Sequence, residues 1–161
     1  MAVGILGLTM ALGFSGCQSE NQKNQDAYRK IGINSMAEGD YDKAVKSFQK
    51  ALDTSLGKIG AEEIDICYYK AAAQFAKKDY DGAIETYTSL IDYDKENANA
   101  YYLRGSVYLD TDKKDKAFKD YKNAVKYAGR EYEIYEGIYE NLTNKGETEE
   151  AKNYLKKALD I

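Results

Sequence analysis

Apolar side chains recur at every third or fourth position in the segment that follows Gly39 and Asp40. This spacing places them on one side of a helix, with charged residues on the other sides. The glycine before the segment is typical of a turn. The chain contains no proline, so the commonest helix breaker is missing throughout. The pattern therefore predicts a turn at Gly39-Asp40 and an amphipathic helix from Tyr41 to about Leu52. Its apolar positions are Tyr41, Val45, Phe48 and Leu52.

The same pattern returns three more times along the chain. Ala44 recurs as Ala83, Ala117 and Ala151, at steps of 39, 34 and 34 residues. Two further columns follow the same steps, namely Phe48, Tyr87, Tyr121 and Leu155, and Ala51, Leu90, Ala124 and Ala158. A fixed period of this size indicates stacked helical repeats. We therefore predict an all-α chain in which the small residues let paired helices approach closely.

The first unit resembles a tetratricopeptide repeat (TPR) at its signature positions. Tyr28 stands at the usual tryptophan position, and Gly32 matches the small residue of the first helix. Ser35 and Leu56 depart from the pattern. The resemblance implies an α-solenoid of about four helix-turn-helix repeats over residues 25–161, with repeats at about 25–58, 64–97, 98–131 and 132–161. Tyr139 replaces the small residue in the last repeat.

The first two repeats are separated by five additional residues around Ser55 to Glu63. Gly57 and Gly60 lie in this stretch and predict the end of a helix and a loop. The insertion is either a tolerated loop or a lip over a binding groove. Cys67 follows the insertion, at the repeat position that Tyr28 occupies in repeat 1. This position faces the interior, so we expect the free cysteine to serve as a small hydrophobic core residue.

The N-terminal segment is apolar and carries no charge from Met1 to Gly16. Its length suits a signal peptide and is too short to span a bilayer. Phe14-Ser15-Gly16-Cys17 resembles the lipobox of bacterial lipoproteins, which implies cleavage before Cys17 and lipidation of that residue. We expect a signal peptide at 1–16 and a lipidated, polar tether at 17–24. An uncleaved apolar leader is the alternative.

The first basic residue is Lys23, so the segment lacks the positive start of a signal peptide. We hypothesise that the true start lies upstream of Met1.

Composition argues against several chemistries. The chain has no histidine, which is the usual general base and metal ligand. A net charge of −4 with mixed signs offers no basic surface for nucleic acid. The segment from Asp110 to Tyr121 begins like a calcium loop but lacks its glycine and its final glutamate. We expect a protein that is not an enzyme and needs neither a cofactor nor a metal.

The resemblance also implies a concave groove lined by the first helix of each repeat. The positions that usually contact ligands are basic in repeat 1, aromatic in the middle and acidic in repeat 4. The main candidates are Arg29, Ile33, Tyr68, Tyr69, Phe75, Tyr102, Ser106, Glu133, Glu136 and Glu140. Lys30, Met36, Ala72, Asn99, Leu109 and Asn144 occupy further such positions. The alternative is that Tyr68, Tyr69 and Tyr102 pack between neighbouring first helices.

These features predict a lipid-anchored scaffold on the extracytoplasmic face of a bacterial membrane. It would bind a protein or peptide partner in the tyrosine-rich groove, because tyrosine provides amphipathic contact area at low entropic cost. Two alternatives remain open. One is a cell-wall or carbohydrate-binding module that uses tyrosine rings for stacking, and the other is a self-associating structural protein.

Overall fold

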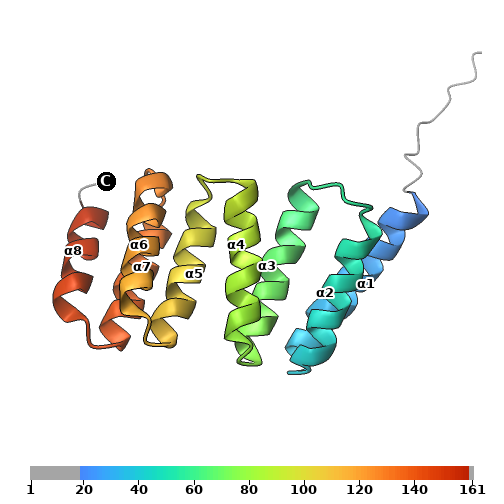
Figure 1. Cartoon of the computed structure of the whole chain (residues 1–161), viewed down its shortest axis with the longest axis horizontal. Helices are drawn as coiled ribbons and strands as arrows, with labels where there is room; N and C mark the ends of the chain where they lie inside the picture. The colour runs from blue at the N-terminus through green and yellow to red at the C-terminus, as the bar shows by residue number, and fades with distance from the viewer. Residues whose placement is uncertain (1–18, 160–161) are drawn as a thin grey trace, which may run out of the picture.

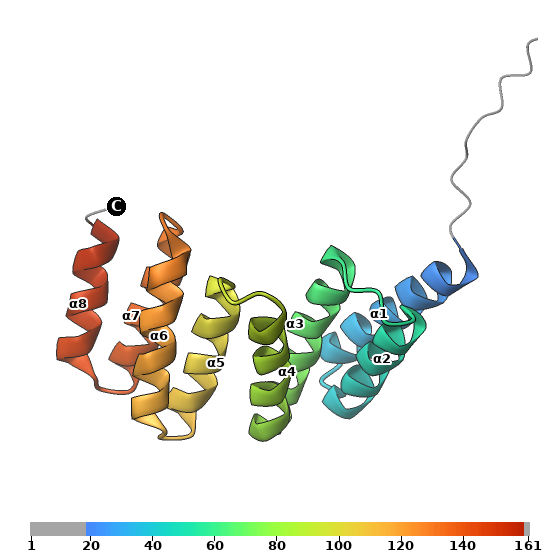
Figure 2. The same ribbon diagram turned by 45° about the horizontal axis from the view of Figure 1, so that its top comes forward.

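The computed structural model describes residues 19–159, which form eight helices in four antiparallel pairs (Figure 1). The helices are α1 (Glu20–Ala37), α2 (Tyr41–Thr54), α3 (Ala61–Ala76), α4 (Tyr80–Tyr93), α5 (Ala98–Asp110), α6 (Lys114–Ala128), α7 (Tyr132–Asn144) and α8 (Thr148–Leu159). The pairs stand in a row from α1–α2 to α7–α8, which both views show (Figures 1 and 2). The predicted all-α solenoid of four repeats is confirmed. The predicted signal peptide and Cys17 lie outside the described residues.

The turn inside each repeat uses one left-handed residue at an equivalent position. Gly39, Lys78, Asp112 and Gly146 have φ angles of 77°, 66°, 57° and 79°. In the first two turns an aspartate follows and caps the second helix. The Asp40 carboxylate accepts a hydrogen bond from the Lys43 N–H at 3.0 Å, and that of Asp79 accepts one from Gly82 at 3.1 Å. Such caps satisfy N–H groups that a helix start leaves without partners. The turn predicted at Gly39-Asp40 is confirmed.

The repeating small residues form the buried seam of each helix pair. Ala44, Ala83, Ala117 and Ala151 are all at most 1% exposed. A Cβ atom added to Gly32 would lie 2.5 Å from the Phe48 ring. Any larger residue would therefore force this aromatic side chain out of its position. The predicted close approach of the paired helices is confirmed.

Three apolar clusters fill the solenoid, and each one joins a repeat to its neighbour. The first combines Phe48 of α2 with Ile66 of α3, and the second combines Tyr87 of α4 with Val107 of α5. The third surrounds Tyr121 of α6 and reaches α7 and α8. Each repeat is therefore joined to the next by its own apolar cluster, as expected for stacked repeats.

The prediction of a tether is wrong for residues 20–24, which form the first turns of α1. The Ser19 hydroxyl accepts a hydrogen bond from the Gln22 N–H at 3.2 Å and caps the helix. Further along, the Gln25 side chain donates to the Glu63 carboxylate of α3 at 2.7 Å. The polar composition of residues 20–24 suggested a flexible tether, but Gln22 in this segment donates a hydrogen bond to the Glu62 carboxylate and so helps to hold α1 against α3.

Repeat 2 also begins earlier than predicted, because α3 starts at Ala61 and not at Ile64. The Glu63 carboxylate accepts a hydrogen bond from the Gly60 N–H at 2.8 Å. This contact replaces a missing helical partner at the helix start. The inserted residues therefore shorten to a loop at 55–60, in which Leu56 and Gly57 have φ angles of 53° and 77°.

Candidate protein-binding surface

All predicted contact residues lie on the first helices of the repeats, α1, α3, α5 and α7. Helix α1 contacts α3, and α5 contacts α7, so the first helices meet directly between repeats 1 and 2 and between repeats 3 and 4. We call the outward side of these four helices the first-helix face. Figures 1 and 2 show α1, α3 and α7 behind the second helices of the row.

The tyrosines of α3 are half-buried rather than fully displayed on this face. The Tyr69 ring stacks on Phe48 of α2 with 5.7 Å between ring centroids. The Tyr68 hydroxyl donates to the Asn97 side chain at 2.7 Å. Burial raises the pKa of Tyr68, although the hydrogen bond with Asn97 acts in the opposite direction. Both residues therefore help to join helices, with Tyr69 reaching the second helix of repeat 1 and Tyr68 the start of α5.

Three other predicted residues also contribute to packing. Ile33 lies against the cluster around Phe48, and the Phe75 ring meets Tyr80 edge-on with 5.6 Å between centroids. Tyr102 of α5 lies over Gly137 of α7, where an added Cβ would clash with the Tyr102 ring. Gly137, two positions before Tyr139, is therefore a small residue of repeat 4 that makes room for contact with repeat 3.

Ser106 is the centre of a small polar network. Its hydroxyl donates to the Tyr102 carbonyl oxygen at 2.9 Å and accepts a hydrogen bond from the Asn141 amide at 2.8 Å. The Tyr121 hydroxyl lies 3.5 Å from the same Ser106 oxygen. Burial raises the pKa of Tyr121 to about 12, despite the hydrogen bonds from its neighbours. Ser106 therefore joins α5, α6 and α7, and its hydroxyl is largely committed to this role.

The two charged ends of the predicted groove differ. Arg29 forms an ion pair with Asp65 of α3, and its guanidinium lies 5.3 Å from the Tyr69 ring centroid. The positive charge of Arg29 at this end of the predicted groove is therefore partly neutralised by Asp65. Glu133, Glu136 and Glu140 of α7 are instead exposed. Their spacing of three and four residues puts them on one side of the helix, where they form an acidic row.

Sequence analysis missed a buried ion pair between α5 and α6. Asp120 is 3% exposed, and its carboxylate accepts two hydrogen bonds from Arg104 at 2.7 and 2.8 Å. The third arm of this guanidinium donates to the Thr88 hydroxyl of α4 at 2.9 Å. The available signal was an aspartate in the inward stripe of α6, at the repeat position where Ser47 and Thr86 are also buried. Its partners identify this pair as structural.

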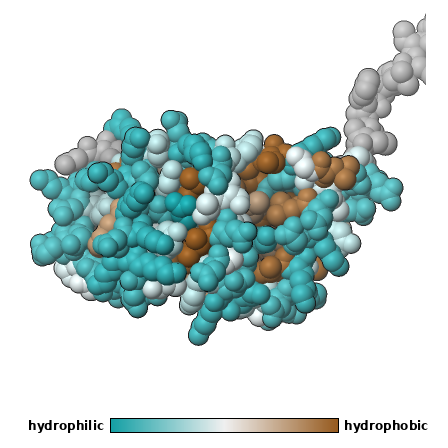
Figure 3. Space-filling view, in the orientation of Figure 1, coloured by the Kyte–Doolittle hydropathy of each residue, from teal (hydrophilic) through white to brown (hydrophobic). Residues whose placement is uncertain are grey.

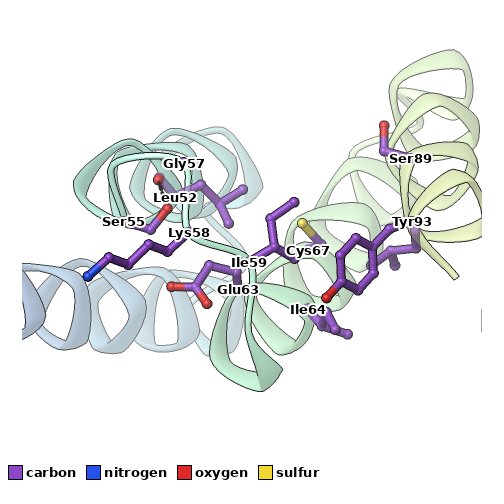
Figure 4. A pocket seen from close by; sticks show the side chains of 11 residues that line it. Leu52, Ser55, Gly57, Lys58, Ile59, Glu63, Ile64, Cys67, Ser89 and Tyr93 are labelled. Carbon is purple, nitrogen blue, oxygen red and sulfur yellow. Dashed lines mark hydrogen bonds between the residues drawn. The ribbon is translucent and has the colours of Figure 1, made fainter.

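A second missed feature is an apolar pocket of about 260 Å³ between repeats 1 and 2 (Figure 4). It lies between the end of α2, the 55–60 loop, α3 and the end of α4. Its walls include Leu52, Ile59, Ile64, Cys67, Leu90 and Tyr93. Cys67 is half-buried in this wall, and burial raises the pKa of its thiol. Cys67 therefore has the apolar surroundings that we predicted, but it lines a pocket and does not lie in the closed core.

Within residues 19–159, no helix is both long and apolar enough to cross a membrane. The same part of the chain contains no group of three or more cysteine, aspartate or glutamate side chains suited to a metal ion.

Comparison with known proteins agrees with the repeat architecture. The sequence model of the family described as "Tetratricopeptide repeat" matches residues 26–56, 98–130 and 140–161, and one described as "TPR repeat" matches residues 71–112. No curated protein sequence matches the chain.

Solved structures with a similar fold include several of MamA. The "Crystal structure of MamA" has a TM-score of 0.65 and 26% identity, over 85% of this chain and 77% of that one. MamA from Desulfovibrio magneticus RS-1 has a TM-score of 0.66 and 22% identity, over 88% of this chain and 76% of that one. A further structure, of MamA AMB-1, has a TM-score of 0.59 and 18% identity, over 85% of this chain and 72% of that one.

The repeat period, the four antiparallel helix pairs and the family matches lead to one assignment. The matched residues cover more than half of the chain. Solenoids of this kind are scaffolds for protein–protein interaction, and the family is generally not enzymatic. The chain belongs to the tetratricopeptide repeat family.

Proposed function

We propose that this chain is a lipid-anchored scaffold that binds a protein partner along its first-helix face. The observation that carries the proposal is the acidic row of Glu133, Glu136 and Glu140 on α7. These three charges lie at one end of the surface that the family uses for ligands, and all three side chains are exposed. A partner segment with basic residues complements this row, and charge complementarity fixes its position and direction.

The rest of the first-helix face supplies a rigid wall for such a segment. Tyr69 and Tyr102 are held by ring contacts and by the neighbouring helix, so their rotamers are fixed before a partner arrives. Side chains that are already ordered lose little entropy on binding. Their remaining exposed edges offer apolar contact beside the charged row.

Charge reversal of the acidic row tests the surface without disturbing the core. The triple variant Glu133→Lys, Glu136→Lys and Glu140→Lys is compared with the reversal of three exposed acids on second helices, namely Glu85, Asp115 and Glu150. A photo-cross-linking residue at Asn144, one turn along α7, reports contacts of the full chain in its native membranes. We expect an adduct of defined mass that the first triple variant loses and the control keeps.

An adduct that survives reversal of the acidic row, or disappears equally in both variants, contradicts the proposed surface. An adduct of twice the mass of this chain would instead identify self-association. Alanine variants of Tyr68 or Tyr102 are less suitable here, because both rings also hold helices together.

The anchor is proposed from the sequence around Cys17. Lipidation of this residue attaches the scaffold to the extracytoplasmic face of a bacterial membrane, and two acyl chains provide stable attachment. The test is metabolic labelling with a radioactive fatty acid, combined with membrane fractionation. We expect label and membrane association in the full chain and neither in Cys17→Ser. Unchanged labelling in Cys17→Ser would contradict the proposed anchor and would leave the proposed binding surface unaffected.

A further inference from the structure

The solenoid has two edges with different chemistry. Because the helices of each pair are antiparallel, the start of α1 and all connections between repeats lie on one edge, seen at the top of Figure 1. We call this the loop edge, and it contains residues 55–60, 94–97 and 129–131. The opposite, turn edge contains the turns inside the repeats, at 38–40, 77–79, 111–113 and 145–147.

Exposed apolar side chains are concentrated on the loop edge. Among residues 19–159, six large apolar side chains are exposed, and five of them lie there: Leu56, Ile59, Tyr93, Tyr132 and Leu159. The sixth, Ile31, lies in the middle of α1. The four turns of the other edge consist of glycine, threonine and charged residues. An uneven distribution of this kind marks an interaction surface, whereas single scattered apolar residues do not.

The apolar character is strongest near α1, where the inserted loop lies. Leu56 and Ile59 are 74% and 56% exposed, and Tyr93 at the end of α4 is 55% exposed. Ile59 and Tyr93 also line the apolar pocket between repeats 1 and 2. Figure 3 shows apolar surface gathered over this end of the molecule, on the side of α1 and α2. We call Leu56, Ile59 and Tyr93, together with this pocket, the apolar end of the loop edge.

Leu56 gains little from folding in this position. Its φ of 53° is a left-handed conformation that disfavours a side chain with a Cβ atom, and most of its surface remains in water. A glycine or asparagine would suit the backbone better, and a polar residue would suit the exposure better. A leucine there is explained more readily by something outside the chain that covers it.

The proposed anchor identifies what covers it. Ser19 follows Cys17, the proposed lipid attachment site, by only two residues in the sequence, and two residues of extended chain span at most about 7 Å. Ser19 in turn shares a surface hollow with Ser55, Leu56 and Lys58 of the inserted loop. An acyl anchor on Cys17 therefore brings this loop to the level of the lipid head groups.

We propose that the apolar end of the loop edge inserts into the membrane–water interface, and this inference rests on the proposed anchor at Cys17. Leucine and isoleucine enter the boundary of the acyl region, and the tyrosine ring sits at head-group level, where its apolar body and polar hydroxyl are both satisfied. The charges nearby are mixed, with Lys58 and Lys95 beside Asp94 and Glu96. Binding therefore depends on apolar insertion, and uncharged phospholipid suffices. The charged turn edge then points away from the bilayer.

A single tryptophan provides a direct probe, because the chain contains none. The full chain, produced in a bacterium that processes lipoproteins, is reconstituted in phosphatidylcholine vesicles with and without brominated acyl chains. Ile59→Trp places the probe on the loop edge, and Glu38→Trp places a matched control in an exposed position on the turn edge. We expect brominated lipid to reduce the emission of the first variant roughly twofold or more and to leave the second unchanged.

Vesicle flotation, read in the same samples, separates this inference from the anchor. Protein that floats while Ile59→Trp stays unquenched, or while both variants are quenched equally, overturns the membrane-facing edge and leaves the anchor intact. Protein that fails to float overturns the anchor and, with it, this inference. Circular dichroism confirms that each variant keeps its helical content, and Leu56→Trp gives a second probe of the same loop if Ile59→Trp is misfolded.

Discussion

Repeats 3 and 4 share one sequence pattern but differ in how completely they are packed. Tyr121 in α6 and Leu155 in α8 occupy the same repeat position, yet Tyr121 is 0% exposed and Leu155 is half-buried. In repeat 3, Gly105 makes room for the Tyr121 ring, to which an added Cβ would approach within 2.8 Å. Repeat 4 has Tyr139 at the position of this glycine.

The difference shows that a helix pair in this solenoid is completed by its neighbour. Tyr154 of α8 meets the Tyr121 ring edge-on at 6.3 Å between centroids, and Asn141 of α7 reaches the Ser106 network. Repeat 4 thus covers the interior of repeat 3. The stability of each repeat depends on its neighbours as well as on its own sequence.

The largest expected difference comes from removing the equivalent side chains. Tyr121→Ala leaves a cavity in a closed interior and should lower the free energy of unfolding by about 3–5 kcal/mol. Leu155→Ala removes a side chain that is already half in water and should cost about 1–2 kcal/mol. Urea denaturation followed by far-UV circular dichroism measures both. Equal losses at the two positions would show that repeat 4 is packed as tightly as repeat 3.

The buried ion pair of repeat 3 should rank second. Asp120→Ala leaves the Arg104 guanidinium, whose side chain is only 15% exposed, without its carboxylate partner, and we expect a loss of about 3 kcal/mol. Glu149→Ala in α8 breaks an exposed pair with Lys152 and serves as the matched control. Its midpoint of denaturation should remain unchanged. If Asp120→Ala were as mild as this control, the pair would not be a structural centre of repeat 3.

The dependence of stability on alkaline pH tests how completely Tyr121 of repeat 3 is buried. The pKa of Tyr121 is raised to about 12 by burial, against about 10 in an unfolded chain. Between these values the unfolded chain releases the proton while the folded chain keeps it, so the Tyr121 contribution is complete below pH 10 and is lost as the pH rises towards 12. Its share of the loss is about 2 kcal/mol. Tyr121→Phe should show a correspondingly shallower decline in stability over this range.

The smallest effect concerns the surface contact between the two repeats. Lys114 at the start of α6 forms an exposed ion pair with Glu147 in the turn before α8. Lys114→Ala should lower the melting temperature only slightly in dilute buffer, and the difference from the unmodified chain should vanish in 1 M salt, which is roughly the strength that screens charges beyond about 3 Å. A large difference that persists in salt would mean that this contact, and not the interior, joins the repeats.

Features that repeat along the chain were predictable. The alanine column, the turn at Gly39 and the apolar stripe all follow from local geometry, and the alanines and the stripe recur with the period. They fixed the number of repeats, the pairing of helices and the first-helix location of the candidate residues. The left-handed Lys78 and Asp112 of the next two turns were not predicted.

Features that occur only once were not predictable, because they depend on how two helices are rotated against each other. Arg104 reaches Asp120 and Thr88 through such a placement, and Asn141 reaches Ser106 in the same way. Tyrosine adds a further ambiguity, since its ring suits a core and its hydroxyl suits a surface. For this reason the sequence left the roles of Tyr68, Tyr69 and Tyr102 open between packing and display.

The hydrogen bonds of the Arg104 guanidinium to Thr88 and Asp120 affect the order in which the repeats unfold. One guanidinium holds a hydroxyl of repeat 2 and a carboxylate of repeat 3, so neither repeat opens without breaking bonds that belong to the other. Repeats 2 and 3 should therefore exchange their amide hydrogens as one cooperative unit, whereas the outer helix pairs fray independently and earlier. Unfolding would then advance from both ends of the row towards the Arg104 contacts between repeats 2 and 3.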